Sequence, residues 1–161
     1  MRLLLPILPI ALAGCLSSDP FAGTDPLRLD PATASVTVGL PGGVPVPPDA
    51  VTLSLRAEGP GGPVAETATL VPSRGAYVVA DADVAPFAAA LARVRRMEAR
   101  APDATSGSLS LALALCGVEV PDGPVTAAMD LGEGLPRVGI LRDLDLAEAR
   151  RAAPGGGECP T

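Results

Sequence analysis

The stretch DVAPFAAALARVRRMEAR, residues 83–100, decides the fold class of this chain. Its larger apolar residues share spacings of three and four: Val84, Phe87, Leu91, Val94 and Met97. Such spacing is typical of one face of an α-helix, and the alanine-rich interior also favours a helix. Asp83 is expected to cap the amino end, and Pro86 is tolerated in a first turn, where its missing N–H costs nothing. The helix is expected to end before Pro102.

Before this helix, apolar residues alternate with polar or small ones, which is typical of half-buried strands. Three stretches show the pattern, 34–40, 51–58 and 64–71, and AYVVA at 76–80 is expected to be a short fourth strand. The glycines and prolines of GPGGP at 59–63 predict a turn. The strands on either side of this turn are therefore expected to form a hairpin.

Strand patterning returns after the helix in GSLSLALALC, residues 107–116. Leucine occupies every second position from Leu109 to Leu115, so the leucines point one way and smaller residues point the other. We expect a central strand with its leucines in the core. The stretch 124–131 is expected to pair with this strand across the turn VPDG at 120–123.

The C-terminal part of the domain is expected to add two short elements. The stretch RVGILR at 137–142 predicts a strand. A short helix is predicted over 143–151, because Asp145 and Glu148 have the spacing of a capping box. Strands, one long helix and then more strands predict an α+β fold, mainly an antiparallel sheet or sandwich with the helix packed on its leucine face.

The first fifteen residues have the three parts of an export signal. Arg2 supplies a positive charge, residues 3–12 are apolar, and Ala13 and Gly14 are small. This apolar run of ten residues is too short to cross a bilayer, which takes about 20. The leader, residues 1–14, is therefore expected to be removed during export.

The motif Leu12-Ala13-Gly14-Cys15 resembles the lipobox of bacterial lipoproteins. The resemblance implies that Cys15 receives diacylglycerol through a thioether and that a signal peptidase cleaves between Gly14 and Cys15. The acyl chains would then hold the protein on a membrane. Because Leu16 rather than an aspartate follows the cysteine, the resemblance favours the periplasmic face of the outer membrane.

The mature chain is expected to contain one folded domain. Residues 15–33 include three Asp-Pro steps, which predict a lipidated N-terminus followed by an extended tether. The domain is expected to span 34–151, and residues 152–161 form an irregular tail.

The composition excludes several kinds of chemistry. The chain contains no Lys, His, Asn, Gln or Trp. Without histidine there is no Ser-His-Asp or Cys-His pair and no imidazole metal ligand, and without lysine there is no Schiff base. We therefore expect no enzyme activity, no metal and no other cofactor.

The charge of the chain argues against a nucleic-acid partner. The formal net charge is −6, and removing the leader takes away one arginine and no acid, which leaves 11 − 18 = −7. Phosphates would repel such a chain.

Two cysteines remain if Cys15 carries lipid. Cys116 and Cys159 are then an even pair in an oxidising compartment, and we predict a disulfide between them that fastens the tail to a strand. The alternative is two unpaired thiols, one of them buried.

One group of basic residues is a candidate binding surface. Arg93, Arg96 and Arg100 lie at i, i+3 and i+7, on a helix face opposite Phe87 and Leu91. Their guanidinium groups suit phosphate or carboxylate, so anionic headgroups or an acidic partner are candidate ligands. The interpretation that we favour is a solvated face of an amphipathic helix.

No residue is predicted to be catalytic. The acidic pairs Asp81/Asp83 and Asp143/Asp145 each precede a predicted helix, so helix capping is the expected role. Ser73 has no suitable base available in this composition, and it is expected to lie in a turn.

Together these features predict a lipid-anchored, periplasm-facing envelope lipoprotein that acts as a non-enzymatic interaction or assembly module. Its expected partners are the membrane, through the N-terminal lipid, and an envelope protein. The alternative is a small ligand-binding or enzyme-inhibitor domain in the periplasm. The sequence leaves the oligomeric state open.

Overall fold

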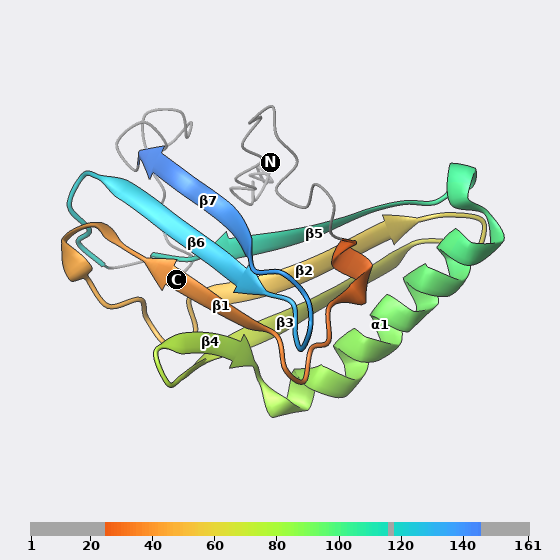
Figure 1. Ribbon diagram of the computed structural model, residues 1–161, viewed down its shortest axis with the longest axis horizontal. Coiled ribbons are helices and arrows are strands. Elements are labelled where there is room, and N and C mark those ends of the chain that lie inside the picture. The colour runs from red at the N-terminus through yellow and green to blue at the C-terminus, as the bar shows by residue number, and fades with distance from the viewer. Residues whose placement is uncertain (1–24, 116–117, 146–161) are drawn as a thin grey trace, which may run out of the picture.

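The computed structural model of the chain describes residues 25–115 and 118–145. They form one sheet and one long helix (Figure 1). The strands are β1 (Ser35–Gly39), β2 (Val51–Glu58), β3 (Val64–Ser73), β4 (Ala76–Val79), β5 (Ser106–Leu113), β6 (Pro124–Asp130) and β7 (Val138–Asp145). The helix is α1 (Asp81–Arg100), and three short 3-10 turns are η1 (Pro26–Arg28), η2 (Pro41–Gly43) and η3 (Pro102–Ala104). The predicted α+β class is confirmed.

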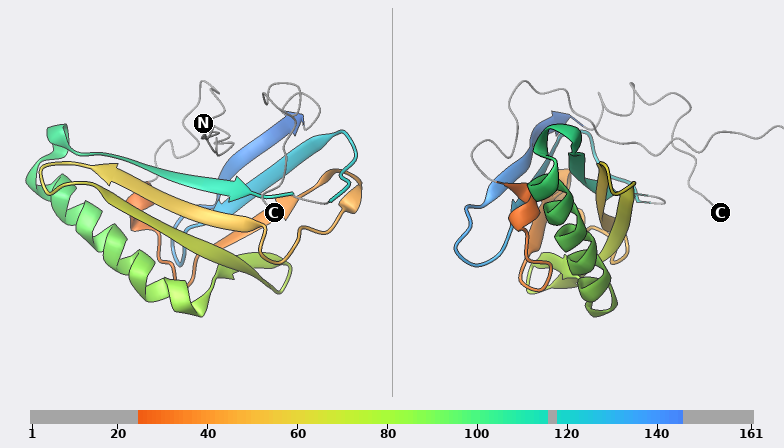
Figure 2. Two further views of the ribbon diagram at one scale, coloured as in Figure 1. Left: turned by 180° about the vertical axis from the view of Figure 1, so that it is seen from behind. Right: turned by 90° about the vertical axis from the view of Figure 1, so that its right-hand side faces the viewer.

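The sheet has the strand order β5-β2-β3-β4-β1-β6-β7, and all neighbours are antiparallel. It curls into a half-barrel, so that the sheet wraps partly around its own apolar face (Figure 2). A sandwich of two sheets is therefore not formed by the described residues. The two edges of the half-barrel are β5 and β7.

The hairpin predicted across residues 59–63 is confirmed, and a second hairpin, which the sequence analysis did not predict, follows it. The β2–β3 hairpin pairs Val51 with Leu70 and Ala57 with Val64, which places the alternating apolar residues of both strands on the core face. The β3–β4 hairpin turns through Arg74 and Gly75, whose φ angles are 48° and 83°. Two successive residues with positive φ match the right-handed twist of the flanking strands, which explains the glycine.

The helix α1 lies along β3 and buries one side against the sheet (Figure 1). The buried side chains are Phe87, Ala90, Leu91, Val94 and Met97. They include four of the five residues whose spacing predicted the helix, so the predicted helix is confirmed.

The amino end of α1 differs from the prediction. The helix begins at Asp81, and its N-cap position, Ala80, makes no side-chain hydrogen bond. Asp83 is not the cap, because its Oδ2 accepts the backbone N–H of Thr69 on β3 at 2.8 Å. The earlier start also places Pro86 inside the helix, beyond the first turn in which we expected it.

The strand β5 is not central, as we expected, but lies at an edge of the sheet beside β2. The reason is the length of the helix. At about 1.5 Å per residue, α1 runs for roughly 30 Å, and it returns the chain to the end of β2 where Glu58 pairs with Ser106. The free edge of β2 is then the nearest place for a new strand.

The strand β6 does not pair with β5 across the 120–123 turn, as the sequence led us to expect. It pairs with β1 on one side and with β7 on the other. The predicted hairpin fails because residues 114–123 separate the two strands, which is far longer than a tight hairpin turn.

The segment before β1 is part of the folded unit, although we expected a tether up to residue 33. Leu29 has no exposed surface and belongs to the main core. The Asp30 amide donates to the Leu131 carbonyl at 3.0 Å, and η1 contacts α1. The folded unit therefore includes the described residues before Ala34. Residues 15–24 of the predicted tether lie outside the described residues.

The predicted C-terminal helix over 143–151 is wrong at its start. The strand β7 extends beyond the predicted 137–142 and includes residues 143–145. Strand geometry prevails there because Leu144 and Asp145 pair with Val125 and Pro124 of β6. The rest of the predicted helix and the tail lie outside the described residues.

Candidate functional site

No described residue offers a buried reactive group. The core of the described part is entirely hydrophobic, with no buried polar or charged side chain. Within 25–115 and 118–145 there is no group of three or more carboxylate, cysteine or histidine side chains that could hold a metal ion. A shallow depression beside the β2–β3 turn has a single ionisable side chain, that of Glu58, among its lining residues.

The predicted arginine face lies on the outer side of α1. Arg93, Arg96 and Arg100 are all exposed, opposite the buried Phe87 and Leu91. The geometry of the face is thus as expected. Its binding of anions stays a prediction.

Arg93 also has a structural role. Its Nη2 donates to the Gly61 carbonyl at 2.9 Å, and Gly61 lies in the β2–β3 turn. This bond ties the turn to the helix, which leaves Arg96 and Arg100 as the more independent members of the face.

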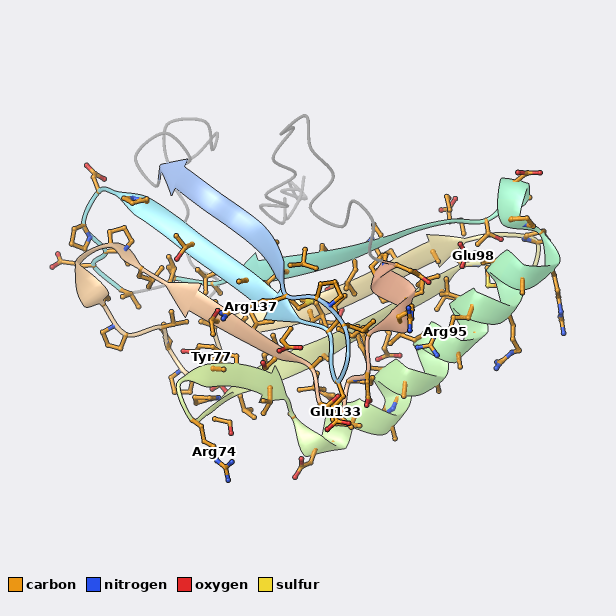
Figure 3. The ribbon with its side chains drawn as sticks, viewed as in Figure 1. Arg74, Tyr77, Arg95, Glu98, Glu133 and Arg137 are labelled. Atoms are coloured by element: carbon orange, nitrogen blue, oxygen red, sulfur yellow. The ribbon has the colours of Figure 1, made fainter. Side chains whose placement is uncertain are left out.

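Arg95, which the sequence analysis left out of the predicted face, donates to two backbone carbonyls. Its Nε donates to the Leu27 carbonyl at 2.6 Å, and its Nη2 lies 3.4 Å from the Leu29 carbonyl. The side chain points from α1 toward η1 (Figure 3). The alternation of Leu27 and Leu29, which we assigned to the tether, was a signal that this segment packs against the domain.

Arg95 fixes the place where the N-terminal segment joins the domain. It satisfies two backbone carbonyls of this segment, in addition to the burial of Leu29 and the Asp30–Leu131 hydrogen bond. The contact of Arg95 with this segment therefore helps to hold η1 against α1.

The outer edge of β5 is one of the two free edges of the sheet that the described residues form. The Ala114 amide donates to the Ala50 carbonyl at 2.7 Å, in register with the β2–β5 ladder. Peptide groups of an antiparallel strand point alternately to its two sides. The peptide groups of Gly107, Leu109, Leu111 and Leu113 therefore point away from β2, where no described strand pairs with them.

The side chains of β5 give this edge two different faces. Leu109, Leu111 and Leu113 are only half-buried and pack on the edge of the main core. The other face is small and polar: the Ser110 hydroxyl lies 3.5 Å from the Ser54 carbonyl. An added strand would thus meet leucines on one side and small residues on the other.

The described strand at the opposite edge of the sheet is less open to pairing. The sequence of β7 contains Arg142, Asp143 and Asp145, and its ladder with β6 has register shifts. Charged residues and irregularities are common protections of edge strands. The strand β5 contains no charged residue and no proline, and its ladder with β2 is continuous.

Some predicted site residues lie outside the described residues. These are Gly14 and Cys15 at the predicted cleavage and lipidation site, and Cys116 and Cys159 of the predicted disulfide. Among the described residues, no helix is long and apolar enough to cross a membrane.

Comparisons with protein families, with curated proteins and with solved structures find no match for this chain.

Proposed function

We propose that this chain is a lipid-anchored component of a bacterial envelope that faces the periplasm and works as a non-enzymatic interaction module. It receives an extended strand of a protein at the outer edge of β5. The observation that carries the proposal is the uncharged, unprotected edge of β5, with the outward peptide groups of Leu109, Leu111 and Leu113. Addition of a strand to such an edge is a common mode of protein recognition.

The support for the anchor is the lipobox-like motif that ends at Cys15. Residues 15 and 25 are separated by 25 − 15 = 10 positions, and a fully extended chain spans at most about 36 Å over that length. The domain would therefore stay close to the lipid surface. This short reach favours partners that are themselves at the membrane.

The support for strand addition is the combination of backbone and side-chain features on β5. Unpaired backbone groups supply hydrogen bonds, and the half-buried leucines supply an apolar surface for alternate side chains of an incoming strand. Burying those leucines fully would add a hydrophobic contribution of about 25 cal/mol per Å² of apolar surface covered.

The anchor is tested by metabolic labelling. Cells that make the full chain are grown with radiolabelled palmitate, and the chain is compared with its Cys15→Ser variant. We expect label in the parent and none in the variant. Equal labelling of both, or none in either, would contradict the anchor and leave the β5 edge untouched.

The interaction edge is tested by photo-crosslinking in intact cells. A photoreactive residue replaces Ser110 on β5 in the full chain, and a matched variant carries it at Arg74, which is exposed in the β3–β4 turn. We expect protein adducts from position 110 and none from position 74. If neither position gives adducts, or if adducts form only within a single molecule, the edge is overturned as an interaction site.

A further inference from the structure

We infer that the strand received at the β5 edge is β5 of a second copy of this chain, so that two half-barrels join through a two-fold axis at Ser110. This inference rests on the proposed function and names the partner at that site. The result would be one continuous antiparallel sheet across both copies.

The sequence of β5 is complementary to itself in the antiparallel direction. With the axis at Ser110, Leu109 faces Leu111 of the second copy and Ser108 faces Ala112. Leu109 and Leu111 then meet on the core side, where Leu113 faces Gly107, and small residues meet small residues on the other side. Residues in directly opposed positions of neighbouring strands are the unit that stabilises a sheet.

The backbone of β5 also agrees with this axis. Two strands pair only if the peptide groups of both point toward the shared edge. The outward residues are Gly107, Leu109, Leu111 and Leu113. An axis at Ser110 matches Gly107 with Leu113 and Leu109 with Leu111, so every pair that exchanges hydrogen bonds consists of outward residues. Ser110 itself then forms a pair that exchanges no hydrogen bonds.

The charges of the chain favour this edge for contact between two copies. The chain has a net charge of −6, so most of its surfaces repel the same surface of a second copy. The strand β5 contains no charged residue. A two-fold axis therefore brings no like charges into direct opposition, whereas β7 would bring its own Arg142, Asp143 and Asp145 to the interface.

The half-exposed leucines give the pairing an apolar contribution. Leu109, Leu111 and Leu113 are partly buried by the main core of their own copy. The second copy's leucines would cover the remaining surface of Leu109 and Leu111. The exposed Ser108, Ser110 and Ala112 on the opposite face are small enough to let the two backbones approach.

The first test uses cysteine crosslinking of the full chain in cells. In the inferred pair the two Ser110 Cα atoms are about 4.5 Å apart, which lies within the range of about 4.4 to 6.8 Å that a disulfide requires. Ser110→Cys is therefore expected to form a disulfide-linked dimer with a mild oxidant. Peptide mass spectrometry identifies the linked residues and separates this bond from bonds of the native cysteines.

Ser108→Cys is the matched control. The axis places Ser108 opposite Ala112, so two copies of Ser108→Cys are four residues out of register, about 14 Å apart at a strand rise of about 3.4 Å per residue. We expect no dimer from Ser108→Cys alone. Coexpression of Ser108→Cys with Ala112→Cys is expected to restore the crosslink. Equal crosslinking of Ser110→Cys and Ser108→Cys would overturn the register.

The second test changes the charge at the axis, where the Ser110 side chain is exposed. Two differently tagged full-length copies of Ser110→Lys, or two of Ser110→Glu, are expected to lose co-purification because like charges oppose each other. One copy of each is expected to regain it. Undiminished co-purification of the like-charged copies contradicts the inference.

The outcomes separate this inference from the proposed function. Photo-crosslinks from position 110 to a different protein, with no self-pairing of Ser110→Cys, would overturn the second copy as partner while the interaction edge stands. Crosslinks from position 110 that form only within a single molecule, and never to a second copy or another protein, would overturn both.

Discussion

Replacing Leu29 with alanine tests whether the N-terminal segment is part of the fold or a tether. Leu29 has no exposed surface and lies in the main core. The change removes three carbon atoms, which at about 0.8 kcal/mol each corresponds to about 2.4 kcal/mol of lost hydrophobic transfer. The remaining cavity adds to this, so the free energy of unfolding should fall by about 3 to 4 kcal/mol.

The assay is urea unfolding of the full chain, followed by circular dichroism. A slope of about 1.5 to 2 kcal/mol per M urea for a domain of this size converts that loss into a midpoint lower by about 2 M. Leu27→Ala is the matched control on the same segment. Leu27 is only half-buried, so its midpoint should fall by less than half as much.

The reasoning is refuted if Leu29→Ala unfolds at the same urea concentration as the parent. That result would mean that the segment contributes nothing to stability, as a tether would. A larger fall in Leu27→Ala than in Leu29→Ala would instead show that the segment packs with Leu27 inward.

Three further predictions concern contacts outside the apolar core. Arg95→Ala should lower the free energy of unfolding by about 1 to 2 kcal/mol because two backbone carbonyls lose their donor, whereas Arg96→Ala, measured by the same urea titration, should change it little. Asp83→Ala should lower the free energy of unfolding by about 1 kcal/mol because the Thr69 amide on β3 loses its acceptor. Hydrogen exchange of the Thr69 amide should accelerate, and unchanged exchange would contradict the hydrogen bond to Asp83. The strands β5 and β7 run in the same direction, so Cys116 and Cys159 follow strands that end at the same end of the sheet. A disulfide between them, which closes a loop of a little over forty residues, should contribute about 4 kcal/mol to the free energy of unfolding. Mass spectrometry without reduction checks this, and recovery of only free thiols rules the disulfide out.

The local elements were largely predictable because their signals are local. The spacing of Phe87, Leu91, Val94 and Met97 predicted α1, and the alternation in VTLSLRAE predicted β2 with its observed bounds. The glycines and prolines at 59–63 predicted the β2–β3 turn. Side-chain period and turn composition are properties of neighbouring residues, so a single sequence contains them.

The partners of the strands were not predictable from the same signals. The leucines from Leu109 to Leu113 fit a central strand as well as an edge strand, because period two records which way a side chain points and not how many strands cover it. The edge position followed from the length of α1, which brings the chain back beside β2.

The candidate site has the same division. The sequence by itself determined the uncharged, alternating composition of β5, the exposed arginines of α1 and the motif that ends at Cys15. Only the tertiary structure decided that β5 has an open edge, that Arg95 holds the N-terminal segment, and that Leu29 is in the core. These depend on contacts between residues far apart in the chain, and the burial and strand pairing of each residue are set by the neighbours that such contacts provide.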